Sequence, residues 1–102
     1  MIIYGFITFE WDDGKAESNL KKHDVSFEEA STVFYDPHAI VIDDDAHSHD
    51  EQRFIILGVS SAARTLIVCH CYWEAREHIR IISARQATSR EEHTYWRRRN
   101  EG

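Results

Sequence analysis

The sequence contains few residues of the kinds that build special loops or cross-links: four glycines, one proline and two cysteines among 102 residues. So few glycines leave neither a glycine-rich loop that could cradle a phosphate nor a Gly-x-Ser-x-Gly nucleophile elbow. Cys69 and Cys71 are too close in sequence to staple a fold, and a single Cys-x-Cys pair is a poor zinc signature. We interpret both as reduced core residues that point the same way along a strand.

Long apolar stretches are missing as well. No run approaches the roughly 18 apolar residues that a membrane helix needs, and no secretion signal is recognisable. We therefore expect a cytoplasmic protein without a membrane partner. A hydrophobic content of 42% with 12% aromatic residues indicates a folded protein. A length of 102 residues suits one domain, residues 1–102.

Positive charge is scarce in the first half of the chain. Residues 1–51 hold 3 Lys against 13 Asp plus Glu, a net charge of −10. Residues 52–102 hold 9 Arg against 5 Glu, a net charge of +4. Together they give the net charge of −6 for the whole sequence. This asymmetry indicates different partners for the two halves, with an anionic ligand for the arginine-rich one. Alternatively, the acidic half serves only to keep the protein soluble.

Hydrophobic periodicity predicts an α+β domain in the order β-α-α-β-β-β-β-α. We expect an antiparallel sheet with two N-terminal helices on one face and a C-terminal helix. The expected strands are Ile2 to Glu10, His38 to Ile42, Arg53 to Val59, Thr65 to Tyr72, and one that begins at His78. The expected helices run from about Lys15 to His23, from Ser26 to the stop at Asp36-Pro37, and from Ser89 to about Arg99.

Capping residues mark the helix starts. Asp12 or Asp13 can cap the first helix, and Ser26 with Glu29 has the spacing of a capping box. Thr88 with Glu91 has the same spacing directly after the last strand. That strand and helix should therefore form one rigid element.

The loop from Asp43 to Asp50 is rich in acidic residues and histidine. Its His47 and His49, together with its aspartates, offer imidazole and carboxylate ligands to a divalent metal. The spacing matches no zinc motif, and the glycine of a calcium loop is missing. We favour a solvated turn and expect no metal or cofactor; a metal hydrolase built on this loop is an alternative that a chelator would test.

Arginines of the second half are candidates for phosphate binding, because arginine stays charged and offers a planar fork of donors. Arg64 precedes one strand, and Arg80 and Arg85 lie on or just past the next. His70 and Tyr72 share a face of the intervening strand, but whether Arg80 shares it depends on a register that the sequence does not fix. If the faces coincide, the group can hold a phosphodiester and move a proton. Alternatively, Arg80 or Arg85 is tied up with a glutamate, the candidates being Glu51, Glu91 and Glu92.

Several stretches together form a more specific pattern than any single motif. They are Phe9 to Asp12 with Lys15 and Asn19, Lys22-His23, Val25 to Ala30, Val33-Phe34, Asp36-Pro37, His47-Ser48 with Glu51 and Arg53, Ile56 to Gly58, Ile79 to Arg85, and Ala87-Thr88 with Glu91 and Tyr95. Through these residues nearly the whole chain resembles the BrnT toxins of bacterial type II BrnT/BrnA toxin-antitoxin systems.

The resemblance implies a RelE-like fold of the RelE/ParE superfamily and a ribonuclease that cuts RNA without metal and arrests growth. It also implies inhibition by a BrnA-like antitoxin, contact with operator DNA only through the complex, and a possible homodimer or heterotetramer. By position, Arg64, Arg80 and Arg85 would face the phosphate, and further helpers would be Lys22, His23, Glu51 and Tyr95.

We therefore predict a catalytic set with three arginines and two proton carriers: Arg64, Arg80, Arg85, His70 and Tyr72. The predicted RNA-binding residues are Lys22, His23 and Arg90.

The chain departs from the family pattern at Ala63, where a glycine is usual, and at Cys69-His70-Cys71, which replaces an aliphatic and tyrosine run. A different class of function also stays open, since fold analogy does not prove catalysis. The ParE branch poisons gyrase instead, so the alternative is a non-enzymatic, protein-binding toxin or interaction module. Co-purification with gyrase and no RNA cleavage would favour it.

Overall fold

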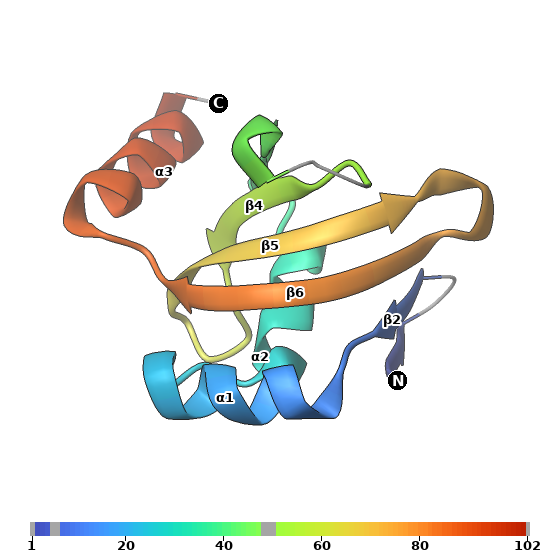
Figure 1. Ribbon diagram of the computed structural model, residues 1–102. Helices are drawn as coiled ribbons and strands as arrows, with labels where there is room; N and C mark the ends of the chain where they lie inside the picture. The colour runs from blue at the N-terminus through green and yellow to red at the C-terminus, as the bar shows by residue number, and fades with distance from the viewer. Residues whose placement is uncertain (1, 5–6, 48–50, 102) are drawn as a thin grey trace.

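The computed structural model describes residues 2–4, 7–47 and 51–101, and within them one six-stranded sheet has the order β1-β2-β6-β5-β4-β3 (Figure 1). The strands are β1 Ile2–Tyr4, β2 Ile7–Glu10, β3 Ile40–Asp43, β4 Phe54–Val59, β5 Thr65–Trp73 and β6 His78–Gln86. The helices are α1 Asp13–His23, α2 Phe27–Thr32 and α3 Ser89–Glu101, with 3-10 turns η1 Val33–Tyr35, η2 Asp45–His47 and η3 Glu74–Arg76.

The predicted α+β architecture is confirmed, with two corrections at the first strand. The segment expected as one strand forms two, because β1 and β2 pair with each other as an antiparallel hairpin. β2 then pairs with β6 in parallel, so the sheet is mixed and not wholly antiparallel. Strands so far apart in sequence are not joined by a hairpin, so nothing in their connection imposes antiparallel pairing. The meander of β4, β5 and β6 is antiparallel as predicted.

The predicted caps form at all three helices. Asp12 Oδ2 accepts from the Lys15 amide at 2.8 Å, and Ser26 Oγ accepts from the Glu29 amide at 3.0 Å. At α3 the capping box is complete, because the Glu91 amide donates to Thr88 Oγ1 at 3.2 Å while the Thr88 amide donates to Glu91 Oε1 at 2.8 Å. Each cap satisfies an amide that the helix itself leaves unpaired.

The sheet has two different faces. α1 and α2 cover what we call the helix face, whose buried core includes Phe9, Val25, Phe27, Ala30, Val33, Ile56, Leu66, Val68, Ile79, Ile81 and Ala84. On the other side, which we call the open face, α3 packs over β4 and β5, where its fully buried Tyr95 contacts Leu57 and Ile67. Figure 1 shows α1 and α2 along the sheet and α3 beyond the end of β6. Much of the open face is therefore left uncovered by helices.

A buried amide fixes α1 to β6. The β2–β6 ladder ends at the pair Glu10 and Arg80, so Ala84 further along β6 has no strand beside it on that side. Asn19 of α1, only 6% exposed, takes that place. Its Nδ2 donates to the carbonyls of Ala84 and Val25 at 2.8 and 3.0 Å, and its Oδ1 accepts from the Ala84 amide at 3.0 Å. The side chain thus replaces a neighbouring strand.

We expect Asn19→Ala to lower the free energy of unfolding by about 2–3 kcal/mol, because it leaves buried backbone groups of Ala84 and Val25 without partners. Urea unfolding followed by circular dichroism measures the change. Asn100→Ala, at an exposed position of α3, is the matched control and should stay within about 0.5 kcal/mol of wild type. Equal stability of the two variants would contradict the structural role of Asn19.

Candidate functional site

A β-bulge in β6 decides where the arginines point. β5 pairs with β6 in a register that shifts between Cys69, opposite Ser83, and His70, opposite Ile81, so Ile82 is an extra residue. In a regular strand Arg80 and Arg85 would lie on opposite faces, because their separation of five is odd. The extra residue reverses that parity and turns both side chains to the open face. The bulge therefore brings the two arginines to one surface.

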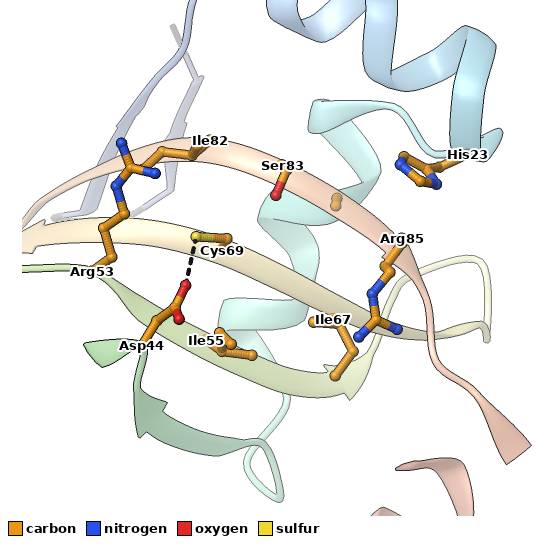
Figure 2. A pocket seen from close by; sticks show the side chains of 10 residues that line it. His23, Asp44, Arg53, Ile55, Ile67, Cys69, Ile82, Ser83 and Arg85 are labelled. Atoms are coloured by element: carbon orange, nitrogen blue, oxygen red, sulfur yellow. Dashed lines mark hydrogen bonds between the residues drawn. The ribbon is translucent and has the colours of Figure 1, made fainter. Parts of the chain in front are cut away.

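The open face is hollowed beside the second of these arginines. A trough of about 280 Å³ is lined by His23, Asp44, Arg53, Ile55, Ile67, Cys69, Ile82, Ser83, Ala84 and Arg85. Figure 2 shows Arg53 and Arg85 at its two ends, with Ser83 between them and His23 beyond Arg85. Isoleucines from β4, β5 and β6 contribute its apolar surface. Cationic groups around an apolar floor suit a ligand with both an anionic and an aromatic part, such as a nucleotide.

Arg85 is held in place by Glu91. Its Nη1 and Nη2 donate to the two carboxylate oxygens at 2.8 and 2.9 Å, and Nη1 also donates to the Gln86 carbonyl at 3.3 Å. A guanidinium has five N–H donors, so three bonds leave two donors that no described residue accepts. The side chains of Arg85 and Glu91 are 41% and 31% exposed. An anion in the trough can thus bind Arg85 while Glu91 keeps the Arg85 side chain in its orientation.

Arg80 lies at the other end of the open face. Its Nη2 donates to both carboxylate oxygens of Glu51, at 3.0 and 2.9 Å, and its guanidinium lies 5.3 Å from the centre of the Trp73 ring. Its buried Nε has no hydrogen-bond partner among the described residues. His78, on the same strand, pairs through Nε2 with Glu10 Oε1 at 2.9 Å. Pairing with glutamate, one of the alternatives considered above, is thus observed for both Arg80 and Arg85.

His70 and Tyr72 point to the helix face, away from Arg80 and Arg85. His70 is 3% exposed and stands edge-on to the Phe34 ring, with centroids 4.7 Å apart. Burial lowers its pKa to about 4, so the ring is neutral at physiological pH. Tyr72 is opposite Ile79, a core residue of the helix face. The predicted grouping of these two residues with the arginines is therefore wrong, because the register of β5 and β6 puts them on opposite faces.

Arg64 and Tyr95 are not among the residues that line the trough. Arg64 forms an ion pair with Glu29 of α2 through Nε and Nη2, and Nη2 also donates to the Asp24 carbonyl at 2.8 Å. The hydroxyl of the buried Tyr95 donates to Asp36 Oδ2, which also accepts from the Val59 amide at 2.9 Å. Both side chains therefore connect elements of the fold, and the structure does not bring them to the arginines of the open face.

The predicted RNA-binding residues are separated along the chain. His23, at the end of α1, lines the trough, whereas its exposed neighbour Lys22 does not. Arg90 is exposed in the first turn of α3. Arg53, which is not among the predicted site residues, also lines the trough. Alternation along the chain before β4 puts position 53 on the same face as Ile55, which is the signal that could have identified it.

The two cysteines both point to the open face. They are two residues apart on β5, so the sequence predicts that they share a face. Cys69 lies in the trough wall with its thiol 3.6 Å from Asp44 Oδ2, and Cys71 is 1% exposed. Burial, aided by nearby carboxylates, raises the pKa of each thiol to about 11. Both thiols are therefore poor nucleophiles.

The acidic loop and the helices bear on two other kinds of function, metal binding and membrane insertion. Among the described residues no three His, Cys, Asp or Glu side chains are grouped to hold a metal; His49 and Asp50 of the loop lie outside those residues. No helix in the described part of the chain has the length and apolar character to cross a membrane.

The Arg85–Glu91 pair predicts an acid-sensitive component of stability. Hydrogen bonds from Arg85 lower the pKa of Glu91 to about 2, from 4.5. Since the folded state has the lower pKa, the stabilisation is present above about pH 4.5 and is lost as the pH falls toward 2. We expect Glu91→Gln and Arg85→Gln each to remove this part of the pH dependence, measured by thermal unfolding between pH 2 and 7. Identical pH profiles for wild type and both variants would contradict the assignment.

Comparison with known proteins identifies the family. The family model described as "Ribonuclease toxin, BrnT, of type II toxin-antitoxin system" matches residues 11–91. The crystal structure of the Brucella abortus ribonuclease toxin BrnT superimposes with a TM-score of 0.63 at 21% identity, covering 81% of this chain and 99% of that one. No curated protein sequence matches. The structural likeness supports the fold, and from the family match we conclude that the chain belongs to the BrnT ribonuclease toxins of type II toxin-antitoxin systems.

Proposed function

We propose that this chain is an active endoribonuclease whose site is the open-face trough. The observation that carries the proposal is the convergence of Arg53, Arg85 and His23 around one apolar-floored hollow. Arginines can hold the scissile phosphate, and the isoleucine floor can contact a base. Arg80 extends the cationic surface along β6. There the phosphate of a neighbouring nucleotide can replace Glu51 as the partner of the Arg80 guanidinium.

The chemistry that this set can perform is internal phosphodiester transfer. His23 accepts the proton of a ribose 2′-hydroxyl, whose oxygen attacks phosphorus as the bond to the 5′-oxygen breaks. The protonated imidazole then returns its proton to that 5′-oxygen, which leaves a 2′,3′-cyclic phosphate and a 5′-hydroxyl. Arg85 and Arg53 stabilise the negative charge that builds on the phosphoryl oxygens. Every step uses side chains of the chain itself and needs no metal.

Other predicted site residues lie outside the trough. Lys22 and Arg90 are exposed near the ends of α1 and α3, where they can contact phosphates beyond the trough. Arg64 serves the catalytic surface indirectly by joining β5 to α2. We do not assign His70 or Tyr72 to this site, because they lie on the other face.

The biological setting proposed with it follows the family. A type II toxin has an antitoxin partner, here of the BrnA type, and RNA cleavage in the cytoplasm would arrest growth until that partner binds. The same proposal includes a RelE-like fold and contact with operator DNA through the toxin–antitoxin complex.

Loss of a trough arginine should reduce cleavage sharply. We expect Arg85→Gln and Arg53→Gln each to lower kcat for a fluorogenic single-stranded RNA by about 100-fold, because each removes charge stabilisation from the transition state. The assay contains EDTA, which should not change the wild-type rate. Arg97→Gln, at an exposed site of α3, removes the same charge and should retain the wild-type rate. Full cleavage activity in both trough variants would refute the site. Growth arrest by the wild-type protein without RNA cleavage would instead favour the protein-binding alternative.

The proton-transfer role of His23 has a separate signature. His23→Gln should lower kcat by about 10²–10⁴-fold and remove one limb of the pH–rate profile, because it removes the group that accepts and returns the proton. His93→Gln, at an exposed position of α3, is the control and should leave the profile unchanged. A lower rate with the original pH profile would mean that His23 positions RNA without moving the proton.

A further inference from the structure

A second pocket lies on the helix face, on the opposite side of the sheet from the trough. Its volume is about 330 Å³, near the lower end of the range for ligand pockets. It is lined by Ile7, Phe34, Val41, Phe54, Ile56, His70, Tyr72 and Ile79. Seven of these eight side chains are aliphatic or aromatic, so the pocket favours an apolar group.

His70 supplies the buried polar group in this apolar wall. Its Nδ1 lies 3.2 Å from the Val68 carbonyl, which can only accept, so Nδ1 carries the proton. The neutral ring then presents Nε2 as an acceptor, and Nε2 has no hydrogen-bond partner among the described residues. The low pKa of His70, about 4, keeps the ring in this form. The pocket therefore selects a group that is apolar but carries one N–H or O–H donor.

The rim of the pocket indicates a protein ligand. Val41 on the edge strand β3 and Tyr72 on β5 are 56% and 43% exposed, so a partner can cover both of them together with the pocket. Asp43 follows Val41 on the same face and is opposite Phe54, so a carboxylate stands beside the pocket. A carboxylate attracts a basic side chain. An aromatic residue followed by a basic one matches all of these features.

We propose that this pocket receives a tyrosine or tryptophan side chain of the antitoxin, which donates to His70 Nε2 while a neighbouring Lys or Arg pairs with Asp43. The proposal rests on membership of a two-component toxin family and is independent of RNA cleavage by the trough. It gives the antitoxin an anchor on the face opposite the arginines. A second copy of this chain is a poorer occupant, because each copy has a net charge of −6.

The test measures the affinity of the purified chain for the antitoxin encoded with it, by biolayer interferometry. Val41→Asp should weaken binding at least tenfold because it puts a charge in the pocket wall, and His70→Phe should do so because it removes the acceptor while keeping an aromatic ring. Ile42→Asp is the matched control: Ile42 is the next residue of β3, 57% exposed, and points to the open face. We expect it to bind within twofold of wild type, and Val41→Asp to cleave RNA at the wild-type rate.

A spectroscopic measurement separates a direct bond from a structural effect. In the wild-type complex the ¹⁵N resonance of His70 Nε2 should shift on antitoxin binding, as an acceptor nitrogen does when it gains a donor. Wild-type affinity in both Val41→Asp and His70→Phe would overturn the proposal. Equal weakening of antitoxin binding by Val41→Asp and Ile42→Asp, with an unshifted His70 resonance, would also overturn it. So would a homodimer that Val41→Asp dissociates without any loss of antitoxin binding.

Discussion

The pairing of β5 with β6 is the constraint on which the rest of the structure depends. One extra residue, Ile82, divides β6 into two segments of opposite parity. On one side of it Ala84 faces the helices and Arg85 faces away; on the other, Ile79 and Ile81 face the helices and Arg80 faces away. The same alternation that builds the core thus gathers two arginines on the open face. A bulge is a local irregularity, but here it decides the chemistry of a whole surface.

Neighbouring cations on that surface are balanced by carboxylates from elements that the fold already fixes. Glu91 both caps α3 and orients Arg85, so the start of the last helix and the edge of the trough form one unit. Glu51 does the same for Arg80 without a capping role. These pairs are partly exposed, and exposed ion pairs contribute little net stability. Phosphate can therefore compete for the guanidiniums at modest cost.

Much of the fold follows from local sequence signals, whereas the site depends on register. Capping residues such as Asp12, Ser26 and Thr88 act within a few residues, so their roles were predictable from spacing alone. The parallel pairing of β2 and the bulge at Ile82 arise from contacts between distant segments. No pattern of side chains marked Ile82 as an extra residue, and one residue of slip reverses a strand's faces. For that reason His70 and Tyr72 could not be placed from the sequence.

We propose that RNA binds the open face through arginines that the bulge brings together. The most direct measurement is NMR chemical-shift mapping with a single-stranded, 2′-O-methylated RNA that cannot be cleaved. We expect shifts at the guanidinium Nε resonances of Arg53, Arg80 and Arg85 and at the ring of His23, with the ring of His70 unchanged. Shifts at His70 and Tyr72 without any at the three arginines would contradict it.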